Sequence, residues 1–349
     1  MEVWTGSRPP TPLRAVRGVS VADIWAARRR LRPFGEPTPT VVLPGGAGRG
    51  GAPTLLKLET VSPVGSFKWR GALNKMLSLP SDVLRRGVTT FSTGNHGIAV
   101  AYAARELGVP AFVCLPATVA RTKLDRLRAL GAGVDLKAAT QEEAAQRCRE
   151  LQAEHGLTIV EPFDDPDVIA GQGTIGLELL DQHPDLEAVV VPVSGGGLVS
   201  GIAAAMKANS PATRVIGVGA AKAGSMFASV QAGRVLEVAE GETVADSLLG
   251  GLGSDNHYTF EMVCRLGVEV LQVEETAIVE AMVHLLRRVG LAVEGAAAVG
   301  LAALLGGQVE ASGPLAVVVT GRNMDIGEVQ GFPVLPSQEV AGRAGSIGR

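Results

Sequence analysis

Short apolar segments alternate with longer helical segments along most of the chain, and this alternation limits the fold more than any other feature. From Gly87 onward, strand-like segments such as 88–91 and 111–115 are separated by helical segments such as 98–107 and 142–155. Neighbouring parallel strands need a crossover of about this length, and such crossovers are almost always right-handed. The pattern therefore predicts an α/β protein built on parallel sheets.

Two series of this kind follow one another, and they predict two lobes. Residues 83–163 are expected to form a small domain, inserted into a large domain made of residues 19–82 and 164–335. Each domain should contain a mainly parallel twisted sheet flanked by helices, with a ligand cleft between the two. Residues 1–18 and 336–349 mix small and polar residues without periodicity, which predicts a disordered N-terminal extension and a loose C-terminal tail.

Charge and composition argue against several classes of protein. With 32 basic and 35 acidic residues, the formal net charge of −3 gives no electrostatic reason for a nucleic-acid or anionic-membrane partner. No stretch of about 18 apolar residues occurs, and the first residues lack the apolar core of a signal peptide. The cysteines Cys114, Cys148 and Cys264 are far apart, so they indicate neither disulfides nor a metal site. We therefore expect a cytoplasmic protein without a metal, a nucleic-acid partner or a membrane partner.

Residues 65–72 (GSFKWRGA) place Lys68 where a helix is predicted to begin, between an aromatic residue and small residues. A lysine amine desolvated in a cleft has a lowered pKa and can form a Schiff base near neutral pH. Most lysines are solvent-exposed, so this motif indicates a reactive amine only together with others.

Residues 92–97 (STGNHG) lie where a strand ends and a helix begins. The first backbone N–H groups of a helix have no intrahelical partner and can bind a carboxylate. An ordinary helix cap made by Ser92 or Thr93 is the alternative interpretation.

Residues 194–198 (SGGGL) directly follow the apolar strand 187–193. Three glycines let the backbone approach a phosphate closely, and the following helix adds its dipole. The spacing is not GxGxxG, so the dinucleotide loop of a nicotinamide-dependent oxidoreductase is the weaker alternative. A Walker phosphate loop is excluded because GK[ST] is missing.

Residues 320–323 (TGRN) end the last apolar strand. A hydroxyl there can donate to a heteroaromatic nitrogen without protonating it, which leaves the ring a weaker electron sink than a carboxylate partner would. Such a ring suits elimination at the β-carbon better than transamination.

Taken in this order, SFKWRGA, STGNHG, SGGGL and TGRN resemble the fold type II (tryptophan synthase β-like) pyridoxal-phosphate enzymes, in the branch of serine/threonine dehydratases (ammonia-lyases) and serine racemases. The resemblance runs from about Ser20 to Gln330. It implies a pyridoxal 5'-phosphate cofactor held by the large domain, a small amino-acid substrate and a homodimer.

The resemblance also implies roles for individual residues. Lys68 would form the Schiff base with the cofactor and act as catalytic base, and Thr93 would be the second catalytic residue. The implied cofactor contacts are Phe67, Lys68, Asn95, Gly195, Gly196, Gly197, Leu198, Glu294 and Thr320. The implied substrate contacts are Ser92, Thr93, Gly94, Asn95, His96 and Arg322. For Glu294 a plain helix N-terminal charge, and for Arg322 a surface position, stay open as alternatives.

Three departures from the family pattern bear on the reaction. Thr320 and Arg322 replace serine and glycine of the usual SGGN motif, which adds a cation near the cleft. Residues 217–220 lack the glutamate that metal-dependent relatives carry, so we expect this cation site to be absent or altered. Position 93 is threonine where racemases use serine, which argues against racemisation. Residues 245–253 (ADSLLGGLG) and the TGRN motif resemble dehydratases assigned to hydroxyectoine utilisation, which implies a hydroxylated diamino acid as substrate.

These observations predict an ammonia-lyase that eliminates water from a small β-hydroxy amino acid, threonine- or serine-like or a hydroxylated diamino acid, to give a 2-oxo acid and ammonia. Four alternatives stay open: β-replacement as in cysteine synthases, amino-acid racemisation, nicotinamide-dependent oxidation, and a non-catalytic binding protein with the same fold.

Overall fold

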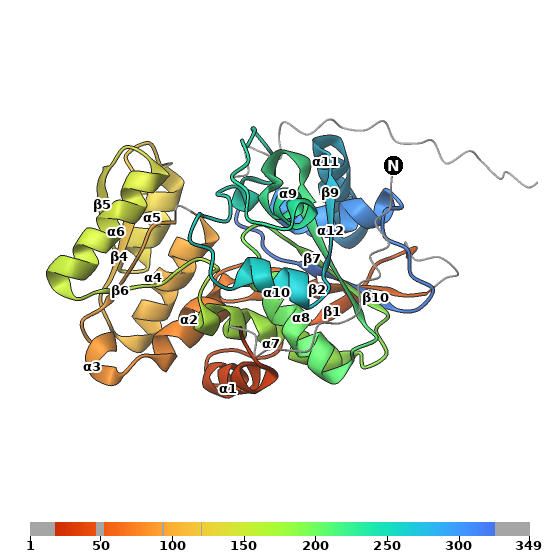
Figure 1. The fold of residues 1–349 in the computed structure, drawn as a ribbon, viewed down its shortest axis with the longest axis horizontal. Coiled ribbons are helices and arrows are strands. Elements are labelled where there is room, and N and C mark those ends of the chain that lie inside the picture. The colour runs from red at the N-terminus through yellow and green to blue at the C-terminus, as the bar shows by residue number, and fades with distance from the viewer. Residues whose placement is uncertain (1–17, 47–51, 93, 120, 325–349) are drawn as a thin grey trace, which may run out of the picture.

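The computed structural model describes residues 18–46, 52–92, 94–119 and 121–324. Within them the chain forms two lobes, each built on its own sheet, which stand side by side in Figure 1. The predicted terminal segments, 1–18 and 336–349, lie outside the described residues except for residue 18. Among the described helices, none combines the length and apolar character needed to cross a bilayer.

The larger lobe contains a six-stranded sheet in the order β1-β2-β10-β7-β8-β9. Only β1 and β2 pair antiparallel; the other pairings in this sheet are parallel. Its strands are β1 (Thr40–Val42), β2 (Thr54–Leu58), β7 (Ala188–Pro192), β8 (Arg214–Ala220), β9 (Glu269–Val273) and β10 (Leu315–Val319). The strands β7 and β10 are buried along their whole length, which explains their continuous apolar sequences.

Helices cover both faces of this sheet. Along β7, Ala188 and Val190 pack with α11 (Glu275–His284) and α12 (Gly295–Leu305), because alternate strand side chains share a face. On the other face, Val189 and Val191 pack with α7 (Pro166–Gln182) and α8 (Gly197–Asn209). The lobe also contains α1 (Val21–Leu31), α9 (Ser225–Ala232), α10 (Thr259–Arg265) and a π-helical turn after α11 (Leu285–Val289).

The helices α7 and α8 touch through glycines. A Cβ atom on Gly201 would lie 2.4 Å from the carbonyl oxygen of Ile169, and one on Gly173 would lie 2.9 Å from that of Gly201. Real Cβ atoms do not approach backbone this closely, so only glycine permits the observed distance between the helices. This contact positions α8, whose first residue is the last of the three consecutive glycines, against the cavity described below.

The smaller lobe contains a four-stranded parallel sheet in the order β5-β4-β3-β6. Its strands are β3 (Val88–Thr90), β4 (Ala111–Pro116), β5 (Gly133–Ala138) and β6 (Thr158–Ile159), and its helices are α4 (Asn95–Leu107), α5 (Arg121–Ala129) and α6 (Gln141–His155). Strand β6 is the shortest of the four, and just beyond it the N–H of Val160 still donates to the carbonyl of Thr89 at 2.9 Å. The predicted α/β class with two mainly parallel sheets flanked by helices is confirmed.

Helix α2 (Lys68–Ser78) packs against both lobes, and α3 (Ser81–Leu84) follows it. The buried face of α2, including Trp69 and Leu73, joins the apolar cluster of the smaller lobe, whereas the helix also packs on α7. The sequence assigned 19–82 to the large domain, and that division remains a proposal. In the structure α2 lies at the junction of the two lobes.

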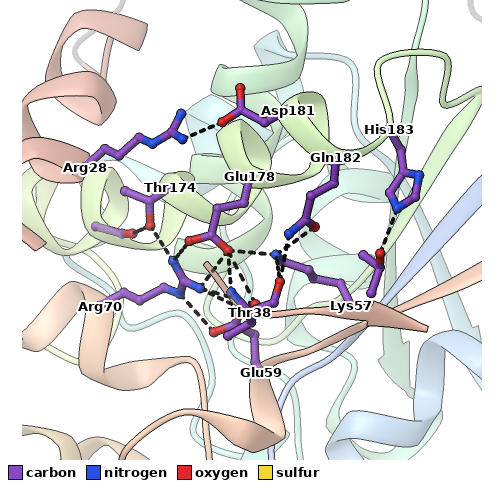
Figure 2. Close-up of polar contacts among 12 residues, drawn as sticks. Arg28, Thr38, Lys57, Glu59, Arg70, Thr174, Glu178, Asp181, Gln182 and His183 are labelled. Atoms are coloured by element: carbon purple, nitrogen blue, oxygen red, sulfur yellow. Dashed lines mark hydrogen bonds and ion pairs between the residues drawn. The ribbon is translucent and has the colours of Figure 1, made fainter. Parts of the chain in front are cut away.

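Four charged side chains are buried together where α2 packs on α7: Lys57, Glu59, Arg70 and Glu178 (Figure 2). The guanidinium of Arg70 donates to both oxygens of Glu59, each at 2.9 Å, and to both oxygens of Glu178, at 2.5 and 3.0 Å. The amine of Lys57 donates to Glu178 at 2.7 Å and to the carbonyl of Thr38 at 2.5 Å. Two cations and two anions therefore balance, and the cluster fixes α2 to β2 and α7.

Removing one member of such a cluster leaves an uncompensated buried charge, which typically costs about 3–5 kcal/mol. We expect Arg70→Met to lower the free energy of unfolding by that amount, measured by chemical denaturation. Arg28→Ala is the matched control, because Arg28 pairs with Asp181 on the outer side of α7, where both side chains are partly exposed. Its expected cost is about 0–1 kcal/mol. Equal losses in the two variants would contradict a structural role for the buried cluster.

Candidate active site

A cavity of about 570 Å³ lies between the lobes, at the carboxyl ends of strands from both sheets. Ligands of open α/β sheets bind at this edge. The predicted residues on the cavity wall are Phe67, Lys68, Ser92, Gly94, Asn95, His96, Gly195, Gly196, Gly197, Leu198, Glu294 and Thr320. The structure thus brings together four motifs that are far apart in the sequence.

Two predicted site residues are not placed on this wall. Thr93 lies outside the described residues, so its predicted catalytic and substrate-binding roles stay predictions. Arg322 is exposed and is absent from the cavity lining, and its backbone N–H donates to the carbonyl of Gly65 at 2.9 Å. The structure therefore shows Arg322 at the surface of the turn after β10, in line with the alternative that it is a surface residue.

Lys68 is the first residue of α2, and its amine reaches into the cavity wall. Its Nζ donates to the carbonyl of Pro162 at 2.7 Å and lies 5.3 Å from the centre of the Phe67 ring. Burial disfavours the charged amine and lowers the pKa of Lys68 to about 8, although the carboxyl of Glu294 opposes that shift. A much larger fraction of this amine is therefore neutral near physiological pH than in an exposed lysine.

His96 lies in the same wall and remains neutral. Its Nε2 lies 2.9 Å from the carbonyl of Val160, which can only accept, so Nε2 carries the proton and Nδ1 is an acceptor. Burial, together with the nearby Lys68, lowers the pKa of His96 to about 3. Nδ1 is buried and has no hydrogen-bond partner among the described residues. His96 can therefore accept a hydrogen bond from a polar ligand.

Asn95 and Glu294 face each other across the lobes. Nδ2 of Asn95, at the start of α4, donates to the two carboxyl oxygens of Glu294 at 2.8 and 2.9 Å. Burial raises the pKa of Glu294 to about 7, while the hydrogen bond from Asn95 opposes the rise. Glu294 also precedes α12 as its N-cap residue, so its two predicted interpretations, a site carboxyl and a helix N-terminal charge, describe the same position.

The glycine turn after β7 leaves no room for side chains on its inner side. A Cβ on Gly195 would lie 2.4 Å from the Phe163 ring, and one on Gly196, whose φ is +89°, would lie 2.6 Å from Met226. The turn leads directly into α8, whose first N–H groups have no intrahelical acceptor. This combination is typical of an anion site for a phosphate group.

Thr320 and the turn that contains Lys68 are joined through backbone contacts. The carbonyl of Thr320 accepts the N–H of Phe67 at 3.0 Å, and Ser66 pairs with Gly321 as an isolated bridge. Thr320 is buried at the end of β10 and lines the cavity. The end of β10 therefore places Thr320 on the same cavity wall as Lys68.

The wall also contains residues that were not predicted from the sequence, among them Lys123, Gln172, Glu240 and Asp246. Gln172 is 1% exposed, and neither its amide oxygen nor its nitrogen has a hydrogen-bond partner among the described residues. A polar residue inside the apolar and glycine-rich stretch 168–173 (VIAGQG) of helix α7 is the signal that could have identified it. Lys123 and Asp246 form an ion pair across the cleft at 3.7 Å, which depends on the arrangement of the lobes and has no sequence signal.

Within the described part of the chain, no group of three or more His, Cys, Asp or Glu side chains could hold a metal ion. The expected lack of a metal site stays a prediction.

The pKa of Lys68 predicts how fast its amine reacts with an aldehyde. Only the neutral amine is a nucleophile, so the rate at which apo-protein forms a Schiff base with pyridoxal phosphate should rise with pH and reach half its plateau near pH 8. The measurement is the growth of the visible Schiff-base band after mixing. A rate that keeps rising through the pKa of about 10.4 of an ordinary lysine would contradict the desolvated position of this amine.

Comparisons with known proteins agree with this geometry. The family model described as pyridoxal-phosphate dependent enzyme matches residues 31–321. The L-threonine ammonia-lyase of Thermotoga maritima is 41% identical over 276 residues, which cover 79% of this chain and 68% of the relative. The catabolic L-threonine dehydratase of Staphylococcus aureus is 36% identical, with coverage of 91% and 93%. The structure of maize serine racemase has a TM-score of 0.85 at 33% identity and covers 90% of this chain and 96% of its own.

These similarities confirm the predicted resemblance to fold type II enzymes of the dehydratase and racemase branch. They give no support to the narrower hydroxyectoine subfamily, which remains a prediction. The cofactor prediction is confirmed at the level of the family, and we set aside the nicotinamide-dependent alternative. With a family match over most of its length, and a buried lysine beside a glycine-rich anion site, the chain belongs to the pyridoxal-phosphate-dependent enzymes.

Proposed function

We propose that this protein is a pyridoxal-phosphate-dependent ammonia-lyase (dehydratase) that removes water from a serine- or threonine-like amino acid to give a 2-oxo acid and ammonia. The observation that carries the proposal is the position of the Lys68 amine, buried in the wall of a cavity that also contains the glycine turn and Thr320. The similarity to threonine ammonia-lyase and threonine dehydratase supports the choice of reaction.

The residues of the cavity fit the cofactor. The turn at Gly195–Gly197 and the start of α8 would hold its phosphate, because the first N–H groups of α8 have no intrahelical acceptor. All three positions are glycine because a Cβ on any of them would clash with another residue. Thr320 would meet the pyridine nitrogen, and Asn95 would donate to the ring oxygen. The buried unpaired atoms of His96 and Gln172 also call for a polar ligand in this space.

When bound, pyridoxal phosphate supplies an aldehyde for a Schiff base and a ring that withdraws electrons from the α-carbon of an amino acid. Lys68 would have two tasks in turn: its amine would hold the cofactor in the resting enzyme, and once the substrate amine has taken its place, the freed amine would take the α-proton. A pKa near 8 suits the second task, because the neutral base is present at working pH. The turn of residues 92–96 would orient the substrate carboxylate through the N–H groups that open α4.

The side chain of the substrate would lie near the outer wall of the cavity. Glu240 and Asp246 bring two carboxylates there, and Lys123 brings one cation. Glu240 accepts N–H groups of Gly250 and Gly251, and Asp246 pairs with Lys123. A polar β-hydroxy amino acid fits this wall, and the acidic excess supports a hydroxylated diamino acid as the finer proposal.

Racemisation is a second candidate, and the similarity to maize serine racemase favours it. We favour elimination because position 93 is threonine where racemases use serine. β-Replacement is a further alternative reaction of the same fold. We also propose a homodimer and a cytoplasmic location, supported by the resemblance and by the absence of any disulfide pattern in the sequence.

Replacement of Lys68 tests the proposal directly. Lys68→Ala should abolish the visible Schiff-base band and lower the rate of 2-oxo acid release by at least roughly a hundredfold to ten-thousandfold. Lys75→Ala is the matched control, since Lys75 lies on the same helix outside the cavity wall and pairs with Asp165. A Lys68→Ala protein that kept both band and activity would refute the assignment.

The substrate is identified by measuring ammonia and 2-oxo acid release from serine, threonine, hydroxyaspartate and hydroxy-diaminobutyrate. Elimination from at least one of them is expected, with little change in optical rotation before product forms. Racemisation without 2-oxo acid would favour the second candidate, and thioether formation with an added thiol would favour β-replacement.

A further inference from the structure

Helix α5 of the smaller lobe reaches across to the turn that follows β10. The guanidinium of Arg126 donates to Oδ1 of Asn323 at 2.7 Å and to the carbonyl of Val64 at 3.0 Å. Asn323 and Val64 both belong to segments that adjoin the six-stranded sheet and the start of α2. The guanidinium of Arg126 thus makes two hydrogen bonds to the opposite side of the cleft.

These contacts fix which way the Asn323 amide points. Arg126 can only donate and the carbonyl of Val64 can only accept, so the amide oxygen faces the guanidinium and the nitrogen faces Val64. Nδ2 of Asn323 donates to Val64 at 2.9 Å and to Oδ1 of Asn95 at 2.5 Å. The amide of Asn323 is therefore held from both sides.

The orientation of the Asn323 amide determines the orientation of the Asn95 amide. Because Oδ1 of Asn95 accepts from Asn323, its Nδ2 must point the other way, towards Glu294, to which it donates at 2.8 and 2.9 Å. The hydrogen bonds run in one direction, from Arg126 through Asn323 and Asn95 to Glu294. Their members alternate between the smaller lobe, the turn after β10, the smaller lobe again and α12.

We propose that Arg126 and Asn323 are positioning residues for Asn95: they hold its amide with the nitrogen towards the cofactor site, and they do so only when the two lobes are together. The proposal rests on the proposed function in one respect, namely that Asn95 donates to the ring oxygen of pyridoxal phosphate. Neither Arg126 nor Asn323 lines the cavity, so both act through Asn95.

The backbone near Asn323 leaves space for this arrangement. Gly65 has a φ of +71°, and a Cβ there would lie 2.8 Å from Oδ1 of Asn323 and 3.2 Å from the side chain of Arg322. A side chain at position 65 would therefore push the amide away from Arg126. Arg322 lies close by but makes no contact in the chain of hydrogen bonds.

Asn323→Asp is the sharpest test, because it changes the hydrogen-bonding pattern with almost no change of shape. The carboxylate can still accept from Arg126, but its second oxygen takes the place of the Nδ2 donor that faced Oδ1 of Asn95. Two acceptors then face each other, so the Asn95 amide must turn over or move away. Arg126→Met removes both hydrogen bonds of the guanidinium but leaves the Asn323 side chain unchanged. Arg128→Met is the matched control on the same helix, since Arg128 is exposed and, within the described part of the chain, its guanidinium pairs only with Asp125, at 3.9 Å.

Each purified variant is stripped of cofactor and titrated with pyridoxal phosphate, and its dissociation constant and visible absorption maximum are recorded. Asn323→Asp should raise the dissociation constant roughly five- to hundredfold and shift the band, and Arg126→Met should raise it roughly fivefold or more, in proportion to the hydrogen bonds lost. Arg128→Met should match the wild type in both readouts.

Wild-type constants and band positions in both Asn323→Asp and Arg126→Met would overturn the inference. A fall in the melting temperature of the apo-protein without any change in band or dissociation constant would reduce the two residues to a structural role and overturn it as well. Failure of the proposed function has a different signature: a wild-type protein that binds no pyridoxal phosphate, or binds it without releasing any 2-oxo acid. In the second case the titration still tests the inference.

Discussion

Lys68 can act on a ligand only if its helix is held at the junction of the lobes, and contacts on opposite sides of that helix hold it there. Residues two positions apart on a helix point in nearly opposite directions, so Lys68 faces the cavity while Arg70 faces inward. Arg70 is held between Glu59 and Glu178, both buried. Phe67 is tied by its N–H to the end of β10. The desolvation that lowers the pKa of Lys68 follows from this fixed position.

The rest of the site consists of backbone turns at strand ends. Glycines at the start of α8 and between α7 and α8 allow backbone to approach backbone and, in the cavity, allow backbone to approach an anion. The smaller lobe contributes Asn95 and His96 from one such turn. Because each lobe supplies only part of the wall, the distance between the lobes determines whether the site is complete.

The local parts of this arrangement could be predicted from the sequence, and the long-range parts could not. Strand-to-helix turns such as 194–198 have strong local signals in glycine and in apolar periodicity, and the structure places Gly195–Gly197 on the cavity wall. Lys57 is a lysine in a short apolar strand, and its burial depends on Glu178, which is distant in sequence. Arg126 lies on a helix rich in charge, RTKLDRLRA, which resembles an ordinary solvated helix until the opposite lobe is in place. Arg322 was a candidate substrate contact because it departs from the family motif, yet its side chain is exposed.

The central claim is that the Lys68 amine, and no other, binds the aldehyde of the cofactor. It is tested most directly by reducing the holoenzyme with borohydride and mapping the modified peptide by mass spectrometry. The account predicts one pyridoxyl group, on Lys68, and none on Lys123, the other lysine of the cavity wall. A stable label on Lys123 or on a surface lysine, with Lys68 unmodified, would contradict it.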